Sequence, residues 1–105
     1  FKRAVRAMTD TTQRALSKCG MTNDDITWLV PHQANFRILL STARNLGIPP
    51  ERVYINIERT GNTSSASVPI ALHEAATKNV FNKGDIIAMC AFGGGLIWGS
   101  AVVRW

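Results

Sequence analysis

The sequence has no long apolar run: none approaches the roughly 20 consecutive residues that a membrane-spanning helix needs. Nothing in these residues resembles a signal peptide, and no low-complexity stretch, linker or internal repeat is evident. Its 105 residues amount to one domain, and 46% of them are hydrophobic, which is enough for a core. The chain starts with Phe1-Lys2-Arg3 and no methionine, so we expect it to be part of a longer protein.

Cysteine is scarce as well. Cys19 and Cys90 are the only two, and neither has the spacing of a Cys-x-x-Cys or Cys/His metal site. We expect two buried thiols in a reducing cytoplasm, and a disulfide between them is the alternative. We predict no metal site.

Acidic residues are outnumbered, with 7 Asp and Glu against 12 Lys and Arg, so the net charge is +5. A basic surface suits an anionic partner. The basic residues are scattered and no nucleic-acid motif is present, which argues against nucleic acid. An acidic carrier protein or a phosphate-bearing thioester suits the charge equally well. A cationic surface without a partner is the alternative.

Apolar spacing divides the chain into helices and strands. It predicts amphipathic helices over residues 2–19, 34–46 and 66–79, and Gly20 ends the first of them. Pro69 is acceptable in the third helix because it falls in the first turn. Apolar and β-branched runs predict strands at Ile26–Val30, Val53–Ile57, Ile86–Phe92 and Leu96–Arg104.

This alternation predicts an α/β fold with a mixed sheet, covered by helices on both faces. The last two strands are joined only by Gly93-Gly94-Gly95, and such a short hinge favours antiparallel pairing.

Three motifs contain the residues best suited to chemistry: His32-Gln33-Ala34-Asn35, Gly61 to Pro69, and Ala91 to Ser100. His32 follows a predicted strand, and loops at strand ends are where α/β proteins place functional groups. A neutral imidazole there can donate a hydrogen bond to a developing oxyanion. A histidine that caps the next helix is the alternative.

The other two motifs offer further hydrogen-bond donors. The amide of Asn62 is a neutral donor, although a turn asparagine in a left-handed conformation fits equally. The glycines at 93–95 allow a ligand to approach main-chain N–H groups closely, and a hairpin hinge is the alternative. A phosphate-binding loop is not expected, because no Gly-Lys-Ser/Thr follows and the next predicted element is a strand.

No nucleophile accompanies these donors. Cys90 lies in mid-strand among apolar neighbours, where a thiol stays protonated and inert, so a dyad with His32 is not expected. His73, beside Glu74 on a predicted helix, is expected at the surface. The motifs therefore predict part of an acyl-transfer site whose other half lies outside this sequence.

Taken together, the three motifs resemble the C-terminal part of β-ketoacyl-[acyl-carrier-protein] synthase III, a family of thiolase-fold enzymes that start fatty-acid synthesis. The resemblance runs the whole chain and corresponds to the last third of such an enzyme. It implies that residues 1–105 are the C-terminal domain, without the N-terminal half that holds the nucleophilic cysteine. One departure is Thr60-Gly61-Asn62, where many relatives have His-Gly-Asn.

The resemblance also implies roles for individual residues. His32 and Asn62 match the histidine and asparagine of the family's Cys–His–Asn triad. Gly94 matches the glycine whose N–H helps to form the acyl oxyanion hole.

Further positions match the family's substrate-binding surface. Ala34 and Asn35 match residues that line the pantetheine tunnel, and Phe1 lies near its mouth. The basic positions that face the acidic carrier protein are matched by Lys2, Arg37 and Arg44.

The resemblance implies a cytoplasmic, homodimeric acyltransferase that needs no metal or redox cofactor. It would condense an acyl-CoA with malonyl-acyl carrier protein in a decarboxylative Claisen reaction, and the 105 residues alone would be inactive. Two alternatives remain: a noncatalytic module of the same fold that binds thioesters or carrier protein, and a relative from a polyketide or quinolone pathway.

Overall fold

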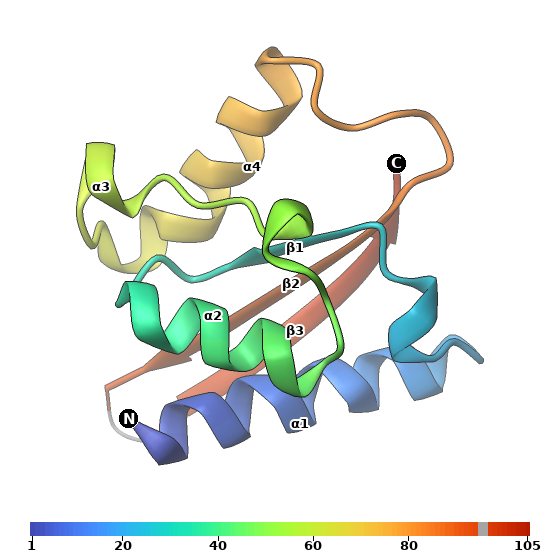
Figure 1. Ribbon diagram of the computed structural model, residues 1–105, viewed down its shortest axis with the longest axis horizontal. Coiled ribbons are helices and arrows are strands. Elements are labelled where there is room, and N and C mark those ends of the chain that lie inside the picture. Colours follow the sequence, from blue (N-terminus) through green and yellow to red (C-terminus); the bar gives the residue numbers. More distant parts are fainter. Residues whose placement is uncertain (95–96) are drawn as a thin grey trace.

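A three-stranded mixed sheet organises the structure, a computed structural model that describes residues 1–94 and 97–105. The strands are β1 (Trp28–Pro31), β2 (Ile86–Gly93) and β3 (Ile97–Arg104), in the order β1-β2-β3. β1 runs parallel to β2, and β2 runs antiparallel to β3 (Figure 1). The predicted mixed α/β sheet and the antiparallel final pair are confirmed.

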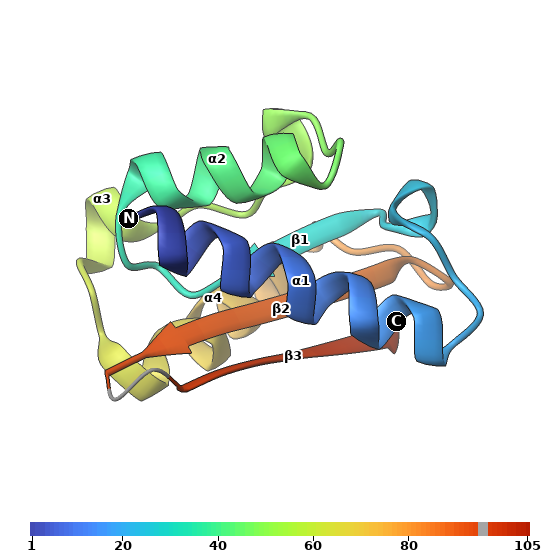
Figure 2. The same cartoon turned by 90° about the horizontal axis from the view of Figure 1, so that it is seen from below.

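The helices lie on the two faces of this sheet. α1 (Lys2–Lys18) and α2 (Phe36–Asn45) pack together on one face, and α4 (Ser67–Thr77) packs on the other against β1 and β2 (Figure 2). A short helix, α3 (Ile57–Thr60), precedes α4. Three 3-10 turns complete the elements, at Asn23–Asp25, Pro50–Arg52 and Ser64–Ala66.

β2 contributes to a core on each side, because successive side chains of a strand point to opposite faces. Ala88 and Cys90 lie in the core beneath α1 and α2, with residues such as Met8 and Leu16. Ile87 lies in the core beneath α4, with Ala71, Ala75 and Phe81. Helices therefore cover both faces of the sheet at β1 and β2, as the sequence predicts.

β3 is covered on one side only. A contact between the hydroxyls of Thr11 and Ser100, 3.1 Å apart, ties α1 to this strand. On the α4 side, Ile97 and Val103 are 71% and 38% exposed. β3 also ends the sheet within the described residues, so it presents an apolar face and an unpaired edge.

The helices begin and end where local signals place them, within a few residues of the predicted bounds. Gly20 follows α1 in a left-handed conformation, with φ of 70°, that suits glycine. α2 begins later than predicted because Asn35 caps it: the Asn35 Oδ1 accepts the Arg37 N–H at 2.9 Å. Pro69 lies in the first turn of α4, as expected.

The predicted strand Val53–Ile57 is wrong. Val53 forms only an isolated bridge to Leu29 of β1, and the Tyr54 N–H donates to the Leu29 carbonyl at 2.9 Å. Further along, the N–H groups of Asn56 and Ile57 donate to the side chain of Gln33 and not to a strand. The backbone therefore leaves the sheet and turns into α3.

The cysteine prediction is half right. Cys90 is buried and Cys19 is exposed, because it follows the last residue of α1, and both thiols are free. No helix in the described residues combines the length and apolar character that crossing a membrane requires.

The apolar face of β3 leads to a testable expectation. The isolated 105-residue chain should self-associate at micromolar concentrations and bind a hydrophobic dye, because Ile97 and Val103 stay in water. Lysine at both positions should reduce association and dye binding in analytical ultracentrifugation, whereas Gln13→Lys, on the exposed side of α1, should not. A wild-type chain that sediments as a monomer and binds no dye would contradict the expectation.

Candidate active site

The three motifs meet at one end of the sheet. Because β1 and β2 are parallel, their carboxyl ends lie at the same edge (Figure 1). His32 directly follows β1, and its N–H donates to the Cys90 carbonyl of β2 at 2.7 Å. Gly94 directly follows β2, and the connection between α3 and α4 brings Asn62 to the same edge. A parallel pair of strands thus brings together residues about 60 positions apart in the sequence.

These residues line one cleft of about 670 Å³. Its polar side chains are those of His32, Asn62, Ser64 and Ser65. The rest of the lining is mainly apolar or glycine: Ala34, Ala91, Phe92, Gly93, Gly94, Ile97, Trp98 and Gly99. An apolar cleft with a few convergent polar groups is the usual form of a small-molecule site.

Burial favours the neutral form of His32. Burial of the side chain lowers the pKa of His32 below its ordinary value of 6.5, because the charged form loses solvation. A neutral imidazole can donate one hydrogen bond without losing its proton. The alternative role, a cap for α2, belongs to Asn35 instead.

Asn62 is oriented by a local turn. Its Oδ1 accepts the Ser64 N–H at 3.0 Å, so the carbonyl side of the amide is engaged and the NH₂ side is left to donate. The left-handed residues of this loop are Gly61 and Ser64, with φ of 67° and 55°. Asn62 is therefore a turn residue, as the alternative interpretation predicted. The left-handed conformation, however, belongs to Gly61 and Ser64 and not to Asn62.

Gly94, which directly follows β2, leaves room for a ligand. A Cβ built on Gly94 meets no atom within 4 Å, so a side chain there would extend into the cleft. Neither Gly93 nor Gly94 is among the glycines with positive φ, so what glycine offers here is close approach of a ligand to the backbone. The hinge expected at 93–95 is described only as far as Gly94, since residues 95–96 lie outside the described residues.

Cys90 is not a nucleophile here. The thiol is fully buried, and burial raises its pKa to about 12. At neutral pH it is therefore protonated and out of reach of a substrate. His73 is exposed on α4, as the sequence predicts. No three His, Cys, Asp or Glu side chains come together as a metal site in the described part of the chain.

Of the remaining residues predicted for the site, some lie in the cleft and others lie outside it. Ala34 lines the cleft. Asn35 is exposed at the start of α2, and its side chain caps that helix. Phe1 and Lys2 line a separate surface groove of about 370 Å³ along α1. The Arg37 guanidinium lies 5.2 Å from the centre of the Phe1 ring, a cation–π contact that joins the starts of α1 and α2.

The basic residues lie together on the α1 and α2 side. Lys2 is at the start of α1, and Arg37 and Arg44 lie seven residues apart on α2, where they share a helix face. All three are exposed. None of the three lines the cleft: Lys2 lines the Phe1 groove, Arg37 contacts the Phe1 ring, and Arg44 lies two turns further along α2.

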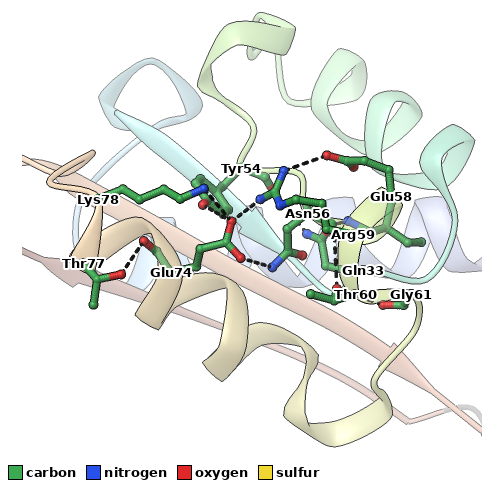
Figure 3. A network of polar contacts seen from close by, with 11 residues as sticks. Gln33, Tyr54, Asn56, Glu58, Arg59, Thr60, Gly61, Glu74, Thr77 and Lys78 are labelled. Atoms are coloured by element: carbon green, nitrogen blue, oxygen red, sulfur yellow. Dashed lines mark hydrogen bonds and ion pairs between the residues drawn. The ribbon is translucent and has the colours of Figure 1, made fainter.

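Sequence reasoning missed Gln33, the buried residue next to His32. It is 1% exposed, and its carboxamide forms hydrogen bonds with the backbone of Pro31 and of the segment 54–57. Figure 3 shows Gln33 beside Asn56 at the start of α3. A polar residue between two apolar-rich elements was its only sequence signal.

A second network, around Glu74 of α4, was also missed (Figure 3). The Tyr54 hydroxyl donates to Glu74 Oε1 at 2.7 Å, and the Asn56 amide donates to Oε2 at 3.3 Å. Arg59 and Lys78 form ion pairs with the same carboxylate. The hydrogen bond from Tyr54, with those from Asn56, Lys78 and Arg59, lowers the pKa of Glu74 to about 2. This network fastens α3 to α4.

Comparison with known proteins identifies the family and the fold. Residues 16–105 match the family model for the C-terminal part of 3-oxoacyl-[acyl-carrier-protein (ACP)] synthase III. The chain is 54% identical to a β-ketoacyl-[acyl-carrier-protein] synthase III of Roseiflexus sp. (strain RS-1), over 100% of this chain and 32% of that protein.

Solved structures show the same likeness. The 3-oxoacyl-[acyl-carrier-protein] synthase III of Aquifex aeolicus VF5 superposes with a TM-score of 0.96 at 46% identity, over 99% of this chain and 34% of the other. The priming β-ketosynthase of the R1128 polyketide pathway gives 0.90 at 36% identity, over 98% and 31%.

The chain belongs to the 3-oxoacyl-[acyl-carrier-protein] synthase III family and matches its C-terminal part. It has the thiolase-like α/β fold of these proteins, as the resemblance implied. It spans about a third of the length of the relatives that it matches.

The Glu74 network should make stability depend on pH. Because the pKa of Glu74 falls on folding, its charged form stabilises the fold above the unfolded value near 4.5, and this is lost as pH falls towards 2. Glu74→Gln should therefore lower the free energy of unfolding at pH 7 by roughly 1–2 kcal/mol. The difference from wild type should shrink between pH 5 and pH 2 in urea titrations of the whole protein.

Glu51→Gln is the matched control, because Glu51 is exposed and takes part in no ion pair among the described residues. It should change stability little at any pH. A Glu74→Gln effect that is the same at pH 7 and pH 3 would contradict the role of the carboxylate charge.

Proposed function

We propose that this chain supplies the donor half of the condensing site of a β-ketoacyl-[acyl-carrier-protein] synthase III. The supporting observation is the single apolar cleft that holds His32, Asn62 and Gly94 together. The complete enzyme would join an acyl-CoA primer to malonyl-acyl carrier protein and so start fatty-acid synthesis. Sequence identity of 54% to a protein of that name, against 36% to a polyketide priming synthase, favours this branch.

In the first half-reaction, a cysteine thiolate attacks the acyl-CoA carbonyl, and CoA leaves as the thiol. That cysteine lies outside these 105 residues, since Cys90 is buried and protonated and Cys19 is far from the cleft at the end of α1. We therefore propose that residues 1–105 are a C-terminal domain that works only with the rest of the enzyme. The backbone N–H of Gly94 serves as one donor to the acyl oxyanion.

In the second half-reaction, malonyl-carrier protein loses CO₂, and the C–C bond electrons become an enolate. The enolate carbon then attacks the acyl-cysteine thioester and expels the cysteine thiolate. His32 and Asn62 donate hydrogen bonds to the enolate oxygen, and because both are neutral they need no proton transfer to do so. In a dry, preorganised cleft each such donor contributes roughly 3–4 kcal/mol to the transition state.

The acidic carrier protein docks on the basic rim of Lys2, Arg37 and Arg44. The rim lies beside the mouth of the path by which pantetheine reaches the cleft along Phe1, Ala34 and Asn35. We propose that the whole enzyme is a cytoplasmic homodimer and that no metal or redox cofactor takes part, because the chemistry needs only a thiol and hydrogen-bond donors.

In the full-length enzyme, His32→Ala and Asn62→Ala should each reduce malonyl decarboxylation about 100- to 1000-fold, which is the usual effect of removing one oxyanion donor. Acylation of the cysteine by labelled acyl-CoA should stay within about threefold of wild type. The reason is that the acyl oxyanion is bound by backbone N–H groups. Product release as labelled CO₂ and trapping of the acyl-enzyme measure the two half-reactions separately.

His73→Ala, an exposed histidine on α4, is the matched control and should leave both half-reactions unchanged. Loss of acylation in both site variants would mean that they act on the thiol. Unchanged decarboxylation in both would favour the noncatalytic module of the same fold.

Arg37→Glu should raise the carrier-protein KM about tenfold or more and leave kcat and the acyl-CoA KM nearly unchanged. Arg37 is exposed at the start of α2, outside the cleft, so charge reversal changes steering of an acidic partner rather than chemistry. The effect should weaken at high salt. Lys83→Glu, which makes the same charge change in the turn before β2, is the control, and an equal KM in the two variants would rule out docking at Arg37.

A further inference from the structure

Gln33 uses its whole hydrogen-bonding capacity within the fold. Its Nε2 donates to the carbonyls of Pro31 and Tyr54 at 2.9 and 3.0 Å. Its Oε1 accepts the N–H groups of Asn56 and Ile57 at 2.9 and 3.1 Å. A primary amide can make two donations and two acceptances of this kind, so the buried side chain is fully satisfied.

The backbone of the same residue makes a further contact. The Gln33 N–H donates to the Ser67 hydroxyl at 2.6 Å, and Ser67 is buried at the first turn of α4. One residue therefore contacts the start of α3 through its side chain and the start of α4 through its backbone.

Asn62 lies on the connection between those two contacts. The segment runs from Ile57 through α3, Gly61 and Asn62 to Ser67, and both of its ends are fastened to Gln33. Gln33 is also bonded covalently to His32, whose own N–H is fixed to Cys90 of β2. The loop that carries one donor is thus anchored to the residue adjacent to the other donor.

We propose that Gln33 is a positioning residue that sets the spacing between His32 and Asn62. This inference rests on the proposed function, in which the two donors act on one enolate oxygen. Two donors can bind a single oxygen only if both lie about 3 Å from it, and a displacement of about 1 Å can cost roughly 100-fold in rate. The other brace on this loop, Glu74 with Tyr54 and Asn56, holds α3 to α4, and it connects to His32 through the bonds that Tyr54 and Asn56 make with Gln33.

A purely structural role makes a different prediction. A buried glutamine that only stabilises the fold would, when replaced, reduce every activity with the amount of folded enzyme. Replacement of a positioning residue would selectively reduce the rate of the step that needs both donors. The two half-reactions therefore distinguish the roles.

The test uses full-length enzyme carrying Gln33→Met, which keeps the length of the side chain and removes its hydrogen bonds. Decarboxylation of malonyl-carrier protein should fall about 10- to 100-fold per folded active site, and acylation of the cysteine should stay within about twofold. Thr12→Val is the control: Thr12 is as deeply buried and donates one hydrogen bond, to Met8 within α1. It should leave the ratio of the two half-reactions unchanged.

Gln33→Glu adds a readout that depends on pH. A carboxylate would face the carbonyl oxygens of Pro31 and Tyr54, which accept hydrogen bonds and repel it. Its protonated form can donate to one carbonyl and still accept from the N–H groups of α3. Decarboxylation by Gln33→Glu should therefore recover severalfold, relative to wild type, as pH falls from 8 to 6.

If Gln33→Met does not fold, Ser67→Ala carries the test, because it removes only the contact to the Gln33 N–H. It should show the same selectivity with a smaller, severalfold loss. Equal losses in both half-reactions, or wild-type decarboxylation in Gln33→Met, would overturn the inference.

His32→Ala and Asn62→Ala are assayed in parallel. If they keep their decarboxylation, the proposed function fails, and hydrogen exchange then decides the positioning role. Amides of residues 57–66 should exchange at least tenfold faster in Gln33→Met while those of β2 do not change. Unchanged exchange in that segment would overturn the inference independently of activity.

Discussion

The parallel pairing of β1 with β2 is the constraint on which the rest of the structure depends. Parallel strands cannot be joined by a tight turn, so the chain between them must leave the sheet and return, and here it forms α2, α3 and α4. The pairing extends past the end of β1 through the His32 N–H. The sheet therefore fixes the backbone of His32, and the crossover must bring Asn62 back to the same edge.

Much of the fold could be predicted because its signals are local. Gly20 ends α1, Pro69 marks the first turn of α4, and the apolar runs of β2 and β3 belong to strands. Where the prediction failed, a distant group had intervened. The β-branched run after Val53 has the composition of a strand, but Gln33, about 20 residues earlier, takes the N–H groups that a neighbouring strand would need.

The candidate site, like the fold, could be predicted only in part from the sequence. His32, Asn62 and Gly94 could be identified from residue type and motif, and the structure brings all three to one cleft. The orientation of the Asn62 amide could not be predicted, because it depends on the Ser64 N–H. The lowered pKa of His32 could not be predicted either, because it depends on burial. Gln33 and Glu74 escaped notice because such residues are mostly exposed, and only tertiary contacts separate these two from surface residues.

The contact between Thr11 and Ser100 joins the first helix to the last strand, 89 residues apart. β3 follows every other element of this structure in the order of synthesis, so the part of α1 that packs on β3 stays uncovered until β3 has been made. Loop closure over so long a separation is slow compared with helix formation. The domain therefore completes its core only after β3 has been made, and until then the uncovered side of α1 is open to association with other chains or with a chaperone.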